Sequence, residues 1–220
     1  MDNPQIPPPQ DPVIDSAEIE ALFTRADGSF AFARWGRPVA PVVFGVTDET
    51  LAVIKGALEA VMALSGHQMA ETDAELGSNL MMFFFRDWDE LPQVPGLDRL
   101  ILDLNPLVAR LKDVDANQYR VFHFDPDGAI KACFVFLRMD ENLSAVPAET
   151  LALSQIVQSV LLWSDQAFKD RSPLAVAGDK TILRPEIAGL IRAGYDPVLP
   201  VQAACPSHAL RLAARVGRPQ

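Results

Sequence analysis

Two strand-like runs joined by a tight turn constrain the fold of this chain more than any other feature. The runs YRVFHFD (119–125) and AIKACFVFLR (129–138) flank the tetrapeptide Asp125-Pro126-Asp127-Gly128. Proline, aspartate and glycine in this order favour a chain reversal, because they readily adopt the backbone angles that a turn requires. The pattern predicts an antiparallel hairpin over residues 119–138.

Strands and a helix are also predicted before this hairpin. Residues 48–65 carry apolar side chains at helical spacing, and a glycine follows them, so a helix is expected there. The run NLMMFFF (79–85) is too short to span a membrane and predicts a central strand buried on both faces. A further buried strand is expected within 38–46, where two prolines place its start toward a sheet edge.

Apolar periodicity predicts several more helices. Asp15 and Glu18 have the spacing of a capping box at the start of a short helix. Other helices are expected over 97–113 with a kink or split at Pro106, over 147–168 as the longest helix, over 185–193 and over 207–216. Helices and strands alternate without a regular βαβ rhythm, which favours an α+β fold with a mixed β-sheet and long packed helices.

The length of 220 residues suits one domain. Five prolines and few apolar residues near the start predict a flexible Pro-rich tail over 1–14, followed by a single α+β domain over 15–216. Cys133 and Cys205 are expected to be free, buried thiols in a reducing compartment. The first residues show no secretory signal, so a cytoplasmic location is predicted.

The charge balance limits the partners of this chain. Acidic residues outnumber basic ones 29 to 19, giving a formal net charge of −10. Such a chain repels nucleic acids and anionic membrane surfaces, so neither is expected as a partner. An unknown protein or a small molecule is the expected partner, and a homo-oligomer is a further alternative.

The familiar catalytic motifs are missing. The chain has no GxxxxGK[ST], GxGxxG, GxSxG or CxxC motif, which disfavours P-loop, Rossmann and α/β-hydrolase chemistry, and we predict no cofactor. One alternative is a metal site in which His67, Glu71 and Asp73 of a single loop meet His123. A solvated loop and a hydrogen-bonded strand histidine explain the same residues. His208, which opens the last helix, is expected on the surface.

An uncharged polar stripe is the most unusual feature of the segment 147–168. Ser154, Gln155, Gln158 and Ser159 fall at i, i+4 spacing on a helix that is otherwise apolar nearly all round. Buried amides need hydrogen-bond partners, so the stripe either faces a polar cleft, in which His123 would take part, or it faces solvent.

The order of these segments resembles zincin-like metalloproteases and a related group of uncharacterised bacterial proteins with zincin-like features. In that pattern an RW-x-x-P segment leads the first strand, a long helix and an Asn-led apolar strand follow, and a hairpin precedes the active-site helix. The matching segments are ARWGRP (33–38), the helix at 48–65, SNLMMFFF (78–85), the hairpin at 119–138, QIVQSVLLW (155–163) and LIRAGYDPVLP (190–200).

The resemblance implies a zincin-like fold without its chemistry. The active-site helix of these proteins carries HExxH, with two zinc-binding histidines and a general-base glutamate. Gln155 and Ser159 stand at the two histidine positions and Ile156 at the glutamate position, so no catalytic residue is carried over. The expected function is a non-catalytic domain with a binding or regulatory role. The alternative is a metal-dependent hydrolase with an unorthodox site around His67, Glu71, Asp73 and His123.

Overall fold

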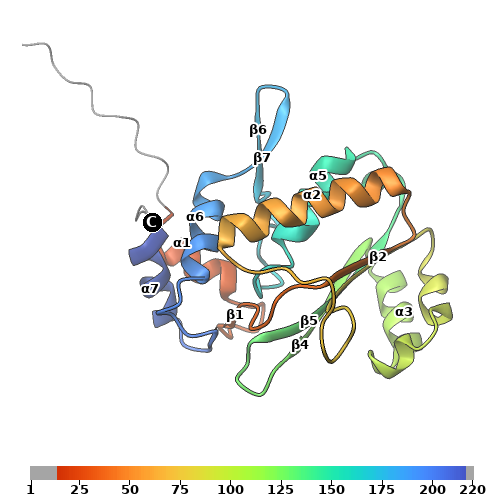
Figure 1. The fold of residues 1–220 in the computed structure, drawn as a ribbon, viewed down its shortest axis with the longest axis horizontal. Coiled ribbons are helices and arrows are strands. Elements are labelled where there is room, and N and C mark those ends of the chain that lie inside the picture. Colours follow the sequence, from red (N-terminus) through yellow and green to blue (C-terminus); the bar gives the residue numbers. More distant parts are fainter. Residues whose placement is uncertain (1–13, 217–220) are drawn as a thin grey trace, which may run out of the picture.

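A four-stranded mixed sheet lies between two layers of helices in the computed structural model, which describes residues 14–216 (Figure 1). The strand order is β2-β3-β5-β4, in which β2, β3 and β5 run parallel and β4 is antiparallel to β5. The strands are β2 (Pro41–Phe44), β3 (Leu80–Phe85), β4 (Gln118–Phe124) and β5 (Ile130–Arg138). The predicted α+β architecture with a mixed sheet is confirmed.

The two central strands are apolar on both faces, which explains why helices cover both sides of the sheet. Leu80 and Met82 of β3 belong to one core cluster, whereas Phe83 and Phe85 of the same strand belong to the other. The first cluster is closed by α1 (Ser16–Phe23), α2 (Asp48–Ser65), α5 (Ala148–Val157), α6 (Pro185–Gly194) and α7 (Ser207–Val216). The second is closed by the 3-10 helices η1 (Trp88–Gln93) and η2 (Leu97–Arg99) and by α3 (Leu104–Asp113).

Smaller elements surround this sandwich. The two-residue strands β1 (Phe32–Ala33) and β8 (Gln202–Ala203) pair antiparallel. The hairpin of β6 (Leu174–Ala177) and β7 (Lys180–Leu183) projects from the body (Figure 1). The short helix α4 (Glu141–Ser144) precedes α5. No helix among the described residues is long and apolar enough to cross a membrane.

Elements specified by local sequence appear where they are predicted. The helix at 48–65, the central strand and the Asp-Pro-Asp-Gly hairpin are all present. Asp15 accepts hydrogen bonds from two backbone N–H groups of α1, and Glu18 accepts the N–H of Asp15, which completes the capping box. The predicted tail lies outside the described residues except for Ile14, which is buried against the first core cluster.

Three local predictions need correction. The segment 97–113 breaks at Asp103, whose φ of 58° is left-handed, and Pro106 lies within the first turn of α3, where it breaks no helical hydrogen bond. The strand predicted within 38–46 is β2, which is an edge strand, as its prolines indicate, but it is half-buried rather than buried. Both cysteines are free, but only Cys133 is buried.

The longest helix is α2 with 18 residues, because α5 ends at Val157 instead of continuing to residue 168. Beyond its end the chain turns toward the segment next to β1. The N–H of Leu162 donates to the carbonyl of Ala33 at 2.9 Å, and Leu161 forms an antiparallel bridge with Arg34. Pairing with a distant segment therefore replaces the predicted helical turns.

Aromatic side chains satisfy the backbone carbonyls at this helix end. The indole Nε1 of Trp163 donates to Val157 O at 2.8 Å, and Trp35 Nε1 donates to Ser159 O at 2.9 Å. The Tyr195 hydroxyl donates to Val160 O at 2.7 Å. All three bonds are buried, so the helix can end inside the protein without leaving these carbonyls unpaired.

Candidate functional site

The predicted polar stripe divides into two pairs, and Gln158 and Ser159 lie just beyond the last residue of α5. Gln155 and Ser159 are 2% and 1% exposed, whereas Ser154 and Gln158 are half-buried. Gln158 Nε2 donates to Ser154 Oγ at 3.0 Å, and Ser159 Oγ donates to Gln155 O at 2.7 Å. One pair therefore turns toward the protein interior, and the other lies at the boundary with solvent.

Gln155 of the buried pair contacts Arg120, which lies on the edge strand β4. The guanidinium of Arg120 donates to Gln155 Oε1 from Nη2, and the same nitrogen lies 3.5 Å from Gln118 Oε1. Gln155 Nε2 in turn donates to Gln118 Oε1 at 3.2 Å. The three side chains form one polar group between α5 and β4, which we call the Arg120 site.

Arg120 carries a charge that no described carboxylate neutralises. Its hydrogen bonds go to amide oxygens alone, and its buried Nε has no hydrogen-bond partner within residues 14–216. Burial lowers the pKa of Arg120 to about 10, so the side chain is still protonated at neutral pH. Burial also raises the pKa of the neighbouring Cys133 thiol to about 12, so that thiol offers no negative charge. A half-buried cation without a counterion is costly.

The outer edge of β4 is open beside this charge. The N–H of Cys133 donates to the carbonyl of Asn79, on the β3 side of β5, so the backbone groups of Cys133 point away from β4. Phe122 lies opposite Cys133 in the antiparallel register, and its backbone groups therefore point away from β5. Arg120 and Gln118 follow at period two and point the same way. Within the described part of the chain β4 pairs with β5 alone, which leaves these N–H and C=O groups free to bind another strand.

His123 is not part of the Arg120 site. Its ring lies 5.3 Å from that of Phe134, which belongs to the core cluster on the α3 side of the sheet. Burial, followed by the charge of Lys131, lowers the pKa of His123. The sheet therefore separates His123 from the polar residues of α5.

The residues of the alternative metal site are held apart by other contacts. One ring nitrogen of His67 is hydrogen-bonded to the carbonyl of Arg37 at 2.8 Å, and burial lowers the pKa of its imidazole. Asp73 is buried in a network of hydrogen bonds, and Glu71 is exposed beside α2. Residues 14–216 contain no group of three or more histidine, cysteine, aspartate or glutamate side chains arranged to hold a metal ion.

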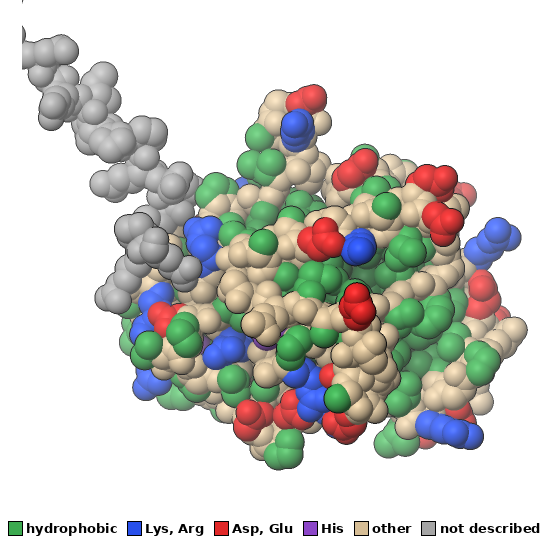
Figure 2. All heavy atoms as spheres, viewed as in Figure 1, with side chains coloured by type: hydrophobic (Ala, Val, Ile, Leu, Met, Phe, Trp, Pro, Cys, Tyr) green, Lys and Arg blue, Asp and Glu red, His purple; other side chains and the backbone are tan. Residues whose placement is uncertain are grey.

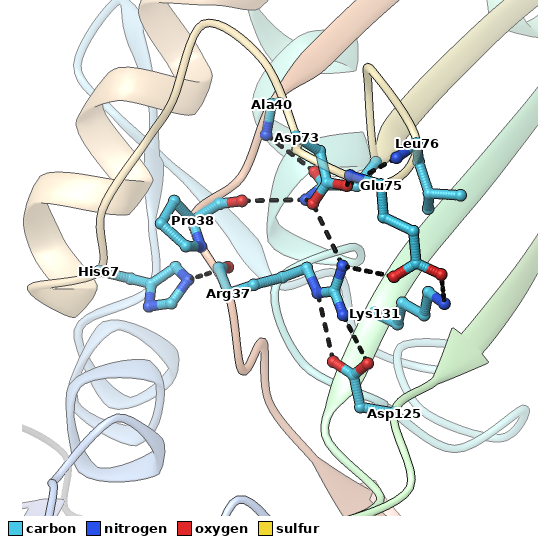
Figure 3. A network of polar contacts seen from close by, with 10 residues as sticks. Arg37, Pro38, Ala40, His67, Asp73, Glu75, Leu76, Asp125 and Lys131 are labelled. Carbon is cyan, nitrogen blue, oxygen red and sulfur yellow. Dashed lines mark hydrogen bonds and ion pairs between the residues drawn. The ribbon is translucent and has the colours of Figure 1, made fainter.

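The network around Asp73 joins three separate loops (Figure 3). Arg37 donates to Asp125 at 2.6 Å and to Glu75 at 3.3 Å, and it lies 3.4 Å from an oxygen of Asp73. Lys131 forms an ion pair with Glu75. Because the charged groups are paired with one another, this network explains how the loops are held together and needs no ligand.

Asn79 anchors the same network in the core. Its side chain is fully buried, accepts the N–H of Ala40 at 2.8 Å and donates to Pro38 O at 2.9 Å. A further bond to Asp73 at 3.1 Å connects it to the charged groups. The asparagine that leads the apolar run thus fixes the start of β3 against the segment before β2.

The polar residues of α5 are visible in the sequence, but Arg120 is not identified there as a site residue. The alternation that groups His123 with Tyr119 and Val121 also places Arg120 on the opposite face of the strand. That face is the one that packs against α5. A lone arginine directed toward an apolar helix layer is therefore the signal in the sequence that predicts this site.

Comparisons with protein-family models, with curated proteins and with solved structures find no match for this chain.

Proposed function

We propose that this protein is a non-catalytic binding domain, and that its ligand is an extended peptide segment carrying a carboxylate. The peptide would pair with the outer edge of β4 and place its carboxylate against Arg120. The observation that carries this proposal is the guanidinium of Arg120, half-buried between β4 and α5 without an acidic partner among the described residues. A carboxylate accepts bidentate hydrogen bonds from arginine and removes the cost of the unpaired charge.

The open edge of β4 supports the choice of a peptide. Backbone groups of Gln118, Arg120 and Phe122 point outward, and added strands gain affinity from such groups and specificity from side chains beside them. The net charge of −10 opposes an acidic ligand at long range. Exposed charges are screened beyond about 8 Å at physiological salt, however, whereas Arg120 would act in direct contact.

A zincin-like architecture belongs to the same proposal. It is supported by the order of strand, helix, strand, hairpin and helix, and by the antiparallel edge strand beside α5. Gln155 and Ser159, at the positions that the resemblance gives to zinc ligands, are engaged with Arg120 and with the helix backbone. Amide and hydroxyl groups are poor zinc ligands compared with imidazole, which supports a role in binding rather than in catalysis.

A pair of synthetic peptides tests this proposal. The probes are a blocked, fluorescently labelled octapeptide of alternating valine and threonine with one central glutamate, and its glutamine counterpart. We expect the wild-type protein to bind the glutamate peptide about 10- to 150-fold more tightly, because a hydrogen-bonded charge pair contributes roughly 1.5–3 kcal/mol. In Arg120→Gln the two peptides should bind with equal affinity.

The matched control is Arg99→Gln, an exposed arginine of η2, which should retain the preference for glutamate. Arg120→Lys keeps the charge and serves as a second variant if Arg120→Gln does not fold. Amide exchange should also slow at Arg120 and Phe122 in the peptide complex, because their N–H groups would become paired. Equal affinity of the wild-type protein for both peptides, or no binding of either, would overturn the proposal.

A further inference from the structure

A second candidate site is the groove between α2 and the edge strand β2, which lies at the opposite edge of the sheet from β4. The groove has a volume of about 510 Å³, within the range of small-molecule sites. Hydrophobic side chains gather between α2 and the sheet edge on this face of the molecule (Figure 2). The feature is independent of the Arg120 site.

The floor and walls of the groove are apolar. Leu80, Met82 and Ile156 of the main core form its floor, and Val42 and Val43 of β2 form one wall. The helix wall is formed by side chains of α2, among them Leu51, Ile54 and Leu58. Such a surface favours the apolar part of a ligand, and the flexible thioethers that line it can adapt to irregular shapes.

The rim of the groove carries an unneutralised carboxylate. Lys55 and Glu59 lie 3.9 Å apart on α2 and are both more than half exposed, so they partly cancel each other. Glu71 lines the same groove and makes no hydrogen bond or ion pair with any residue from 14 to 216. The rim therefore has a net negative charge, as does the whole chain at −10.

We propose that this groove binds a small hydrophobic amine, with its apolar chain between α2 and β2 and its ammonium group at Glu71. The charge of the rim disfavours a carboxylic acid of the same length. The strand edge disfavours a peptide, because β2 has only four residues and begins with Pro41, which has no N–H to donate.

Methionine methyl groups provide a direct readout of this proposal. Met69 and Met82 line the groove, whereas Met81 and Met139 line other depressions of the surface and serve as internal controls. The full chain is labelled with 13C at the methionine methyls and titrated with decylamine at neutral pH. The NMR signals of the Met69 and Met82 methyl groups should shift until they reach saturation. Decanoate should bind about three- to fivefold more weakly, the range of a partly exposed ion pair.

The variant Glu71→Gln should remove the preference for decylamine over decanoate and leave the affinity for decanol unchanged. Glu20→Gln, an exposed residue of α1, is the matched control and should retain the preference. Equal affinity for the amine and the acid in the wild-type protein would overturn the proposal. Shifts confined to Met81 or Met139, or no saturable shift, would overturn it as well.

Discussion

His208 is a buried titratable side chain, although the sequence analysis predicts that it lies on the surface. It is 2% exposed, its ring lies 4.5 Å from that of Phe32, and neither ring nitrogen has a hydrogen-bond partner within the described chain. Burial, followed by the charges of Arg211 and Arg215, lowers its pKa to about 4. A neutral imidazole in this position fills space between α7 and β1 but leaves two polar atoms unsatisfied.

Replacement of this imidazole should stabilise the protein, most of all in acid. The unfolded chain takes up a proton near pH 6.5 while folded His208 resists it, so wild-type stability falls as the pH drops from about 6.5 toward 4. The loss is roughly 2 kcal/mol at about pH 5. We expect His208→Leu to be at least as stable as the wild type at pH 7.5 and more stable at pH 5, measured by urea unfolding. The same pH dependence in both proteins would contradict this prediction.

The end of α5 shows why one helix is mispredicted while its neighbours are predicted correctly. The helix α2 and the β4–β5 hairpin follow from spacing and turn residues within each segment. In contrast, α5 stops just before Ser159 and Val160, whose carbonyls accept hydrogen bonds from Trp35 and Tyr195. These two donors lie 124 and 35 positions from the carbonyls that they bind. Periodicity within a segment carries no information about such partners, so the sequence predicts a helix that continues.

The two tyrosines of the chain offer a matched test of this helix end. Tyr195→Phe removes the buried donor to Val160 O and should cost about 1–3 kcal/mol of unfolding free energy, because that carbonyl would stay buried without a partner. Tyr119→Phe removes a contact with Arg110 at the surface and should cost less than about 0.5 kcal/mol. Urea unfolding of the two variants gives the comparison. A Tyr195→Phe cost no larger than that of Tyr119→Phe would show that the carbonyl finds another partner.

At the scale of the whole molecule, the sheet order brings together residues that the sequence leaves separate. The hairpin inserts its second strand, β5, between β3 and β4, so Arg120 of the first strand lies at an edge beside α5. The sequence predicts the mixed sheet and the polar residues of α5. It does not predict strand order, which depends on how all the apolar faces are covered at once. Of the three side chains of the Arg120 site, only Gln155 is therefore singled out before the fold is known.

The network around Asp73 gives the whole fold a second acid-sensitive contact. Burial opposes the charge on Asp73, but hydrogen bonds from two backbone N–H groups and from Asn79 and Arg37 lower its pKa below 3.8. This contribution to stability is present above the ordinary pKa of aspartate and is lost as the pH falls through the lowered value. His208 weakens the fold at a higher pH, so acid should destabilise the protein in two separate steps.

Asp73→Asn should remove the lower of these two steps. At neutral pH the variant should lose about 2–3 kcal/mol, because Arg37 and two backbone donors lose a charged acceptor in a buried position. The difference from the wild type should shrink in strong acid, because the lowered pKa of Asp73 confines protonation of its carboxylate to pH values below the ordinary range of aspartate. Urea unfolding at about pH 7, 5 and 3 measures both effects, with the exposed Asp98→Asn as the control. A cost that is independent of pH would mean that Asp73 stabilises the loops through its shape and hydrogen bonds rather than through its charge.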